Sequence, residues 1–226
     1  MLKMTGVSKA YRSEVLEIFA LRGISIHVRE GEFVAVTGPS GSGKSTFLTI
    51  AGMLDAFTQG EYELDGVNVY RMRDRERSRL RNEKIGFIFQ SFNLLNDLTV
   101  FDNVDMPLRY RNLGAANRRH RVESALYRVG LSGCTERYPP ELSGGQQQRV
   151  AIARALAGSP RVLLADEPTG NLDEEMAKGV MDLLQEIHRE GATIIVVTHS
   201  AEMTRRAERE VRIVDGSIVR HPLLGP

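Results

Sequence analysis

The sequence has little cysteine, no tryptophan and no long apolar run. Cys134 is the single cysteine among 226 residues, so no disulfide forms within the chain, and this composition fits a reducing compartment. No run of about eighteen apolar residues occurs, and residues 1–5 lack the apolar centre of a signal peptide. We therefore expect a chain that does not span a bilayer and that reaches a membrane only through another protein.

An excess of charge of one sign is also missing. The chain has 30 Lys and Arg against 29 Asp and Glu, a formal net charge of +1. Such a balance provides no broad positive field for nucleic acid, so we expect no nucleic-acid partner. With 26% charged and 42% hydrophobic residues, the composition is that of a soluble globular chain. Its length suffices for one large domain with a substantial core.

What the sequence does contain is a glycine-rich turn between an apolar strand and an apolar helix. Residues 33–37 are apolar and β-branched, as in a buried strand, and residues 47–51 continue as a helix that Gly52 ends. The turn between them has the pattern G-x-x-x-x-G-K-S, and this context predicts a phosphate-binding loop. We expect the whole turn to bind nucleotide, and it consists of Gly38, Pro39, Ser40, Gly41, Ser42, Gly43, Lys44, Ser45 and Thr46.

The chemistry of that turn assigns roles to several of its groups. Glycines at 38, 41 and 43 adopt dihedrals closed to other residues, so successive N–H groups can turn toward an anion. A helix beginning near Lys44 adds the partial positive charge of its N-terminus. We expect Lys44 to reach the β- and γ-phosphates and the Ser45 hydroxyl to bind Mg²⁺.

Two kinds of strand pattern predict two sheets. Residues 2–5, 24–28 and 61–70 alternate apolar with polar residues, with a hairpin signal at Asp65-Gly66, which indicates an antiparallel layer. The second kind is continuously apolar and alternates with helical patterns, which indicates a mostly parallel sheet covered on both faces. The strands of this kind are 85–89, 161–165 and 193–198, and the helices are 146–158, 174–189 and 200–207.

The remaining segments complete the prediction. The mixed charges of residues 71–84 favour a solvated helix, and residues 91–140 have mostly helical patterns, at 100–111 and 115–129. Short strands are expected at 211–214 and 217–219, and a frayed tail at 221–226. The fold class is therefore α/β: a P-loop NTPase core with a mostly parallel sheet, an N-terminal antiparallel β subdomain and a helical insertion.

Two acids follow the apolar strand 161–165. Asp166 and Glu167 come at its carboxyl end, where ligands bind in parallel sheets. Asp166 is suited to hold Mg²⁺ through water, and Glu167 to polarise a water for attack on the γ-phosphate. The alternative is an acid pair that only stabilises a helix N-terminus. The nearby phosphate loop favours the catalytic interpretation.

A second glycine turn opens the helix of residues 146–158. It reads Leu142, Ser143, Gly144, Gly145 and Gln146. Serine and two glycines at a helix start form an anion site by the physics of the first turn. The same string also serves as an ordinary serine N-cap with flexible glycines, and the residues alone leave both interpretations open.

Taken together, these motifs resemble the ATP-binding cassette ATPases over essentially the whole chain. The resemblance rests on the phosphate loop, Gln90, the Leu-Ser-Gly-Gly-Gln turn, the acid pair, Asn171-Leu172-Asp173 and His199, in that order. It implies one nucleotide-binding domain over 1–226, with an ATP-binding core at 1–90 and 159–226 and a helical subdomain at 91–158. It also implies ATP and Mg²⁺ as cofactors and a homodimer that sandwiches two ATP molecules, each phosphate loop facing Ser143 of the partner copy.

The resemblance further implies individual roles. Tyr11 resembles the aromatic residue that stacks on adenine, and Gln90 the glutamine that contacts Mg²⁺ and the attacking water. His199 resembles the histidine that touches the γ-phosphate, and Asp173 the acid that couples the two sites. Without the resemblance, a tyrosine at this place is often a packing residue, and a lone histidine after a strand is more often a structural hydrogen-bonding residue.

Finer resemblance points to a subgroup. Residues 92–100 and 168–173 resemble the ATPases of lipoprotein-releasing, macrolide-export and FtsE-type cell-division systems, although residues 55–58 lack the proline common there. The implied partner is a membrane permease, and the implied location is the cytoplasmic face of the inner membrane. One alternative is an FtsE-like regulator of a periplasmic partner that transports nothing.

Two further alternatives fit less well. A soluble ABC ATPase acting on DNA or ribosomes usually has two cassettes or a long coiled-coil insertion, and the chain contains neither. A nucleotide kinase or GTPase is disfavoured because no guanine motif or second-substrate lid is present.

Overall fold

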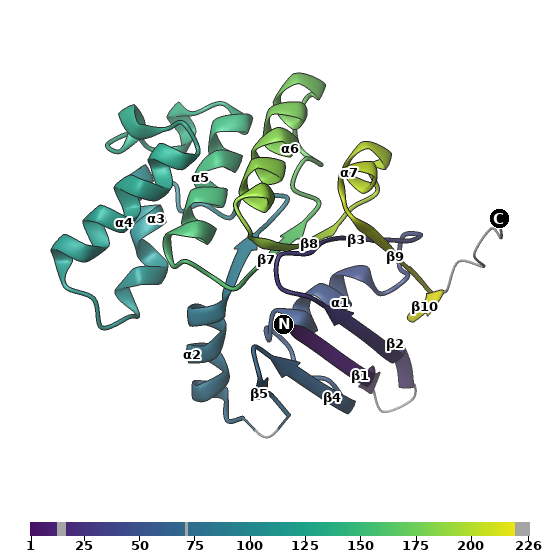
Figure 1. Cartoon of the computed structure of the whole chain (residues 1–226). Coiled ribbons are helices and arrows are strands. Elements are labelled where there is room, and N and C mark those ends of the chain that lie inside the picture. Colours follow the sequence, from purple (N-terminus) through teal and green to yellow (C-terminus); the bar gives the residue numbers. More distant parts are fainter. Residues whose placement is uncertain (13–16, 71, 220–226) are drawn as a thin grey trace.

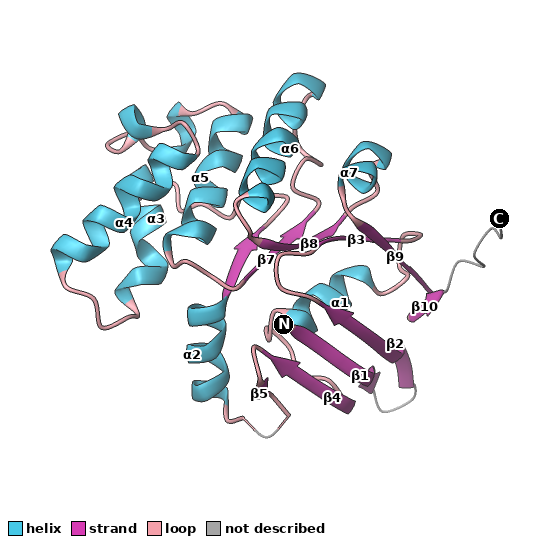
Figure 2. Ribbon diagram, in the orientation of Figure 1, coloured by secondary structure: helices cyan, strands magenta, loops and turns pink. Residues whose placement is uncertain are grey.

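The computed structural model describes residues 1–12, 17–70 and 72–219, so the predicted frayed tail lies outside the described residues. The described strands form two sheets (Figures 1 and 2). The antiparallel sheet has the order β2 (Glu17–Val28), β1 (Leu2–Arg12), β4 (Gln59–Leu64), β5 (Val67–Asn68). The larger sheet has the order β10 (Ser217–Val219), β9 (Arg209–Val214), β3 (Phe33–Thr37), β8 (Thr193–Val197), β7 (Val162–Asp166), β6 (Ile85–Ile88). Adjacent strands of this sheet run parallel, except that β10 runs antiparallel to β9.

The helices lie on both faces of the larger sheet. Their bounds are α1 (Lys44–Ala51), α2 (Asp74–Lys84), α3 (Val100–Arg109), α4 (Ala115–Arg128), α5 (Gly144–Ala157), α6 (Glu174–Arg189) and α7 (Ala201–Arg206). Two short 3₁₀ turns, Ser132–Cys134 and Pro139–Glu141, precede α5. In Figure 1, α1 and the antiparallel sheet lie below the larger sheet, and α3 to α6 lie above it.

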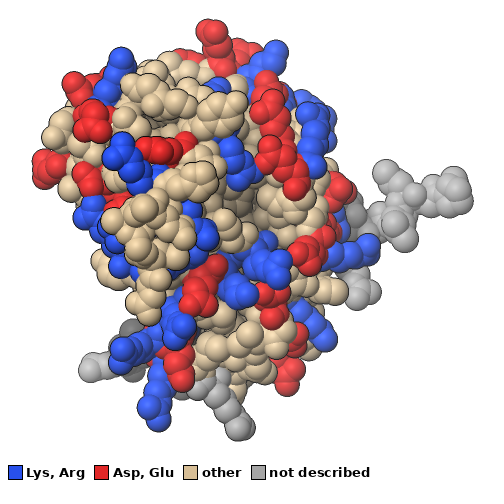
Figure 3. Space-filling model, turned by 60° about the vertical axis from the view of Figure 1, so that its left-hand side comes forward, with Lys and Arg blue, Asp and Glu red and all other residues tan. Residues whose placement is uncertain are grey.

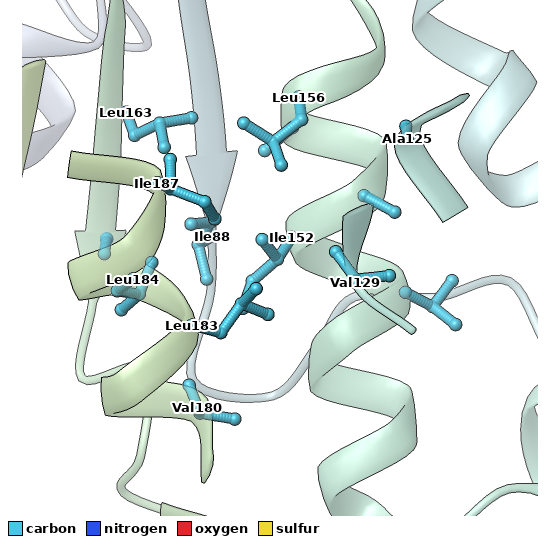
Figure 4. Packing of buried hydrophobic residues seen from close by; sticks show 14 of the residues in the cluster. Ile88, Ala125, Val129, Ile152, Leu156, Leu163, Val180, Leu183, Leu184 and Ile187 are labelled. Atoms are coloured by element: carbon cyan, nitrogen blue, oxygen red, sulfur yellow. The ribbon is translucent and has the colours of Figure 1, made fainter. Parts of the chain in front are cut away.

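Alternate residues of the central strands face two separate cores. On β3, Phe33 and Ala35 pack with α3 to α6, whereas Val34 and Val36 pack with α1 and the antiparallel sheet. β7 and β8 divide in the same way, because successive side chains of a strand point to opposite faces. Figure 4 shows part of the upper core, where Leu163 lies among side chains of α5 and α6. Polar groups are therefore confined to the strand ends, and the carboxyl ends become the place for a site.

The predicted α/β class is confirmed, with differences at element ends. β1 and β2 extend well beyond the predicted residues 2–5 and 24–28, because they pair as one long hairpin with register shifts. α5 begins at Gly144 instead of residue 146, since Ser143 caps it. Within the described residues, no helix combines the length and the apolar character needed to cross a membrane.

A buried hydroxyl joins the antiparallel sheet to helix α1. Tyr62 of β4 is 1% exposed, and its hydroxyl donates to the carbonyl oxygen of Ala51, the last residue of α1. Burial raises the pKa of Tyr62, which keeps the hydroxyl a donor. The antiparallel layer thus holds the C-terminal end of the helix that follows the phosphate loop.

We predict that Tyr62→Phe destabilises the protein by about 1–3 kcal/mol, because a buried carbonyl loses its donor. For a chain of this size the melting temperature should fall by about 2–4 °C per kcal/mol. Thermal and urea unfolding measure the change, and Tyr127→Phe, at an exposed position, is the matched control. Equal melting temperatures for Tyr62→Phe and its control would show that the bond contributes nothing.

Candidate functional site

The glycine-rich turn has the backbone that its sequence predicts. Gly38, Gly41 and Gly43 all have positive φ, at 146°, 75° and 101°. At Gly38 and Gly43, neighbouring atoms also leave no room for a side chain. A Cβ on Gly38 would lie 2.0 Å from the Ile213 oxygen, and one on Gly43 would lie 2.4 Å from the Ala20 oxygen. Glycine is therefore required by both φ and space at positions 38 and 43, and favoured by φ at position 41.

Helix α1 begins at this loop with no side chain to cap it. Its N-cap is Gly43, in the left-handed conformation, and its first turn contains no acid. The N–H groups of the first turn have no intrahelical acceptor in any α-helix. The loop also encloses the hydroxyl of Ser42, which is buried and has no hydrogen-bond partner. Uncapped donors at a helix N-terminus are a binding site for an anion such as phosphate.

The lysine of the loop is folded back over it. The Lys44 ammonium donates to the carbonyl oxygens of Gly38 at 2.9 Å and Pro39 at 2.8 Å. Both contacts are to neutral oxygens, so an anionic oxygen in the loop would compete well for the same ammonium. Ser45 is exposed next to it, with its hydroxyl available to a ligand.

The two acids lie at the end of β7, close to the lysine. Burial and then the charge of Glu167 raise the pKa of Asp166, and the nearby Lys44 acts in the opposite direction. Glu167 has φ of 43°, which is rare for a residue with a side chain. Its backbone is held there by two hydrogen bonds, from Glu167 N to the Val197 oxygen and from Gly170 N to the Glu167 oxygen, each of 2.9 Å.

Glu167 also contacts His199 directly. The His199 ring nitrogen Nδ1 lies 2.8 Å from Oε1 of Glu167, and the His199 backbone N–H donates to Oε2 at 3.3 Å. The imidazole is otherwise open, with a side chain 74% exposed. The contact between Glu167 and His199 arises because β7 and β8 are neighbouring strands of the sheet. The local sequence around either residue does not predict it.

Gln90 lies two residues beyond β6, next to the same segment. Its side-chain Nε2 donates to Oδ1 of Asn171, and Nδ2 of Asn171 donates back to the Gln90 carbonyl oxygen, both at 3.1 Å. The backbone after Gln90 is held by Arg154 of α5, which donates to the carbonyls of Phe92 and Asn93. The sequence predicted no role for Asn171, although it belongs to the Asn171-Leu172-Asp173 motif, and none for Arg154.

The second glycine turn lies apart from the phosphate loop. Ser143 accepts from the Gln146 N–H at 3.3 Å, while Gln146 Oε1 accepts from the Ser143 N–H at 3.0 Å, a reciprocal N-cap. Its glycines are nearest to Phe92, Leu172 and Met176. Leu142 is buried and Ser143 exposed. α5 packs on α3, α4, α6 and β6, and α1 packs on β2, β7 and β8.

Tyr11 and Asp173 are placed by local contacts. The Tyr11 ring, with the residue 49% exposed, lies under the Lys9 ammonium at 4.9 Å from its centroid, and its hydroxyl donates to Asp55 at 3.3 Å. Asp55 belongs to the segment in which the subgroup's proline is missing. Asp173 caps α6 by accepting from the Met176 N–H at 2.8 Å. Both side chains remain accessible to a ligand or a partner.

The oxygen donors suit a cation that is shared with phosphate. Among the described residues, no group of three or more His, Cys, Asp or Glu side chains could hold a metal alone. The site instead offers the Asp166 carboxylate, the Ser45 hydroxyl and the side-chain oxygen of Gln90. Mg²⁺ typically takes one or two protein oxygens together with substrate phosphates, so this donor set fits Mg²⁺ bound with a nucleotide.

The chain belongs to the ABC transporter family, since a profile of that family matches residues 21–170. The predicted resemblance is thereby confirmed, and the chain is an ATPase of the ABC type. One curated relative is the ABC transporter ATP-binding protein YvrO of Bacillus subtilis, 47% identical over 97% of this chain and 96% of that protein. Another is the macrolide export ATP-binding/permease protein MacB of Chlorobium luteolum, 46% identical over 97% of this chain and 33% of that protein.

Solved structures agree over the full length. The dimeric structure of MJ0796, described as a bacterial ABC transporter cassette, superposes with a TM-score of 0.89 at 43% identity and covers 100% of both chains. A dimeric post-hydrolysis state of MJ0796 bound to ADP and Pi has a TM-score of 0.88 at 42% identity, also over 100% of both chains. MJ0796 is a protein of Methanocaldococcus jannaschii. The fold is therefore that of the ABC ATPases.

We predict that Asp166→Asn raises the melting temperature of the nucleotide-free protein by a few degrees at pH 8. A carboxyl whose pKa is raised on folding disfavours the folded state when it is ionised. This penalty is absent below the ordinary value of 3.8 and complete above the raised pKa. The gain should accordingly shrink in thermal unfolding as the pH falls through the raised pKa toward 3.8. The exposed Asp97→Asn is the control, and a lower melting temperature for Asp166→Asn at pH 8 would contradict the assigned cause.

Proposed function

We propose that the chain is the ATP-binding and hydrolysing subunit of a transporter complex, in which two copies enclose two ATP molecules. The observation that carries this proposal is the uncapped start of α1 beside Asp166, Glu167 and His199. The second glycine turn supports it as well, since Ser143 is exposed and its helix α5 packs on other elements than α1 does. In this proposal a site built from one chain would lack that turn, and a partner copy would supply it. The dimeric structures of MJ0796 are consistent with this arrangement.

Each side chain then has a defined task. Lys44 and the N–H groups at the start of α1 would bind the β- and γ-phosphates, and Tyr11 would stack on adenine. Ser45, Asp166 and Gln90 would hold Mg²⁺, which offsets phosphate charge when it is bound with the nucleotide. The partner's Ser143 turn would add a helix N-terminus at the γ-phosphate.

Glu167 and His199 would act on the attacking water and the γ-phosphate. Glu167 would take a proton from the water as general base, with its carboxylate held by the His199 ring and main-chain N–H. His199, in contact with Glu167, would orient that carboxylate and reach the γ-phosphate. Asp173, at the start of α6, would couple the two sites across the dimer.

We further propose that a membrane permease docks beside Gln90 and residues 91–110. A cavity of about 1150 Å³ lies there, lined by apolar and charged side chains of both signs, among them Phe87, Phe89, Tyr110, Arg81 and Glu83. The rings of Phe87 and Phe89 stack at 5.4 Å, and Tyr110 is 82% exposed. Figure 3 shows both signs of charge mixed over this side of the molecule. MacB is named as a macrolide export ATP-binding/permease protein, which favours a permease partner here.

We also propose a division of the chain into two parts. The core would comprise 1–90 and 159–226 and the helical subdomain 91–158, with Gln90 at their junction. The chain would be held at the cytoplasmic face of the membrane by the permease.

We predict that Glu167→Gln lowers ATPase turnover by at least about 100-fold while ATP binding persists, because the base is lost and the phosphate loop is intact. ATP should then trap the dimer, which size-exclusion chromatography with light scattering would detect. Glu186→Gln, at an exposed position on α6, is the control. Undiminished turnover in the Glu167 variant would refute its role.

A second pair of variants separates binding from assembly. Ser143→Arg should abolish hydrolysis yet leave the thermal shift that ATP produces in the single chain, because the turn acts on the partner's nucleotide. Lys44→Ala should lose that thermal shift itself. If Ser143→Arg instead abolished ATP binding to the monomer, the turn would belong to its own chain's site and the two-copy proposal would fail.

A further inference from the structure

Gln90 and Asn171 form a closed pair of amide hydrogen bonds, although they are 81 residues apart. Asn171 contacts the same residue twice. Its Oδ1 accepts from the side chain of Gln90, and its Nδ2 donates to the main-chain carbonyl of Gln90, each at 3.1 Å. The backbone of one residue and its own side chain are thus linked through a second amide.

This geometry determines which way both amides face. The main-chain carbonyl of Gln90 is only an acceptor, so the atom of Asn171 that faces it must be Nδ2. The other branch of Asn171 is then an oxygen, and the atom of Gln90 that faces it must be the donor Nε2. The remaining branch of Gln90 is its oxygen Oε1, which accepts no hydrogen bond from any described residue. The free end of Gln90 is therefore the oxygen, the ligand type that hard cations take.

The surrounding contacts leave space for this arrangement and hold the backbone that carries it. A Cβ on Gly170 would lie 2.7 Å from Nε2 of Gln90, although the φ of Gly170 is not positive. The glycine therefore serves to admit the Gln90 side chain. Arg154 fixes the following carbonyls at Phe92 and Asn93, which have φ of 60° and 50°.

We propose that Asn171 is a positioning residue that orients the Gln90 amide, so that its oxygen and not its NH₂ faces the bound cation. This inference rests on the proposed function, in which Gln90 contacts Mg²⁺. Asn171 itself touches no nucleotide in this scheme. Its effect should therefore appear in the dependence on Mg²⁺ and vanish when Gln90 is absent.

The first test is the Mg²⁺ concentration at half-maximal ATPase activity. Asn171→Ala frees the Gln90 amide to flip and to adopt other rotamers. The fraction of molecules in which the Gln90 oxygen faces the cation therefore falls, and the half-maximal Mg²⁺ concentration should rise by about three- to tenfold. Gly170→Ala displaces the Gln90 side chain by contact and should have the same effect while Asn171 is intact. KM for ATP at saturating Mg²⁺ should stay unchanged in both, and the exposed Asn96→Ala is the control.

The second test measures the NMR signal of the Gln90 side-chain amide in the absence of nucleotide and metal. In the ¹H–¹⁵N spectrum of the nucleotide-free protein, the side-chain NH₂ of Gln90 is assigned by its loss in Gln90→Leu. Its signal should move toward the position of a free amide in Asn171→Ala and in Gly170→Ala. A signal that stays in place in both variants would overturn the orienting contact.

A double-mutant comparison separates the two proposals. In the Gln90→Leu background, Asn171→Ala should cause no further change in the Mg²⁺ requirement. An equal change in that background would overturn the positioning role. If Gln90→Leu alone leaves the Mg²⁺ requirement unaltered, the assignment of Gln90 in the proposed function fails first. A rise with Gln90→Leu but none with Asn171→Ala or Gly170→Ala would reject only the inference about Asn171.

Discussion

The burial of β3, β8 and β7 on both faces determines where this protein can do chemistry. Their side chains alternate between two apolar cores, so a charge anywhere along them would be desolvated without a partner. Charged and hydroxyl groups therefore gather where the strands end. The phosphate loop follows β3, Asp166 ends β7, and His199 comes after β8. Because these strands are parallel neighbours, three segments distant in sequence meet at one edge.

The site that results is electrostatically unfavourable without a ligand. Asp166 is partly buried next to another carboxylate, with the Lys44 charge as the nearest compensation, and Lys44 itself is bonded to loop carbonyls. Glu167 is held in a left-handed backbone conformation, which costs about 1–3 kcal/mol. The phosphates of a bound nucleotide would offset the positive charge of Lys44, and the cation bound with them would offset the negative charge of Asp166. The same features that lower the stability of the free protein thus prepare it for phosphate.

Helix α5 connects the second glycine turn to the rest of the site. Ser143 caps its start, and the buried Gln148 donates to the Pro168 oxygen, just beyond the acid pair. Near its end Arg154 holds the backbone after Gln90. One helix thereby contacts three segments of the proposed site: the serine turn, the segment after the acid pair and the backbone after Gln90. A shift of the helical layer would be transmitted through these bonds to Gln90 and to the acid pair.

Sequence by itself determined the local parts of this protein. The phosphate loop, the capped helices and the apolar strands could be predicted because glycine spacing, capping residues and hydrophobic periodicity act over a few residues. Tertiary structure decided the rest. The contact of Glu167 with His199, the pairing of Gln90 with Asn171 and the hold of Arg154 on Phe92 depend on which strands become neighbours and how α5 packs, and no local pattern encodes those choices. The long β1–β2 hairpin exceeded its prediction for the same reason, since pairing between strands and not alternation alone determines how far a strand extends.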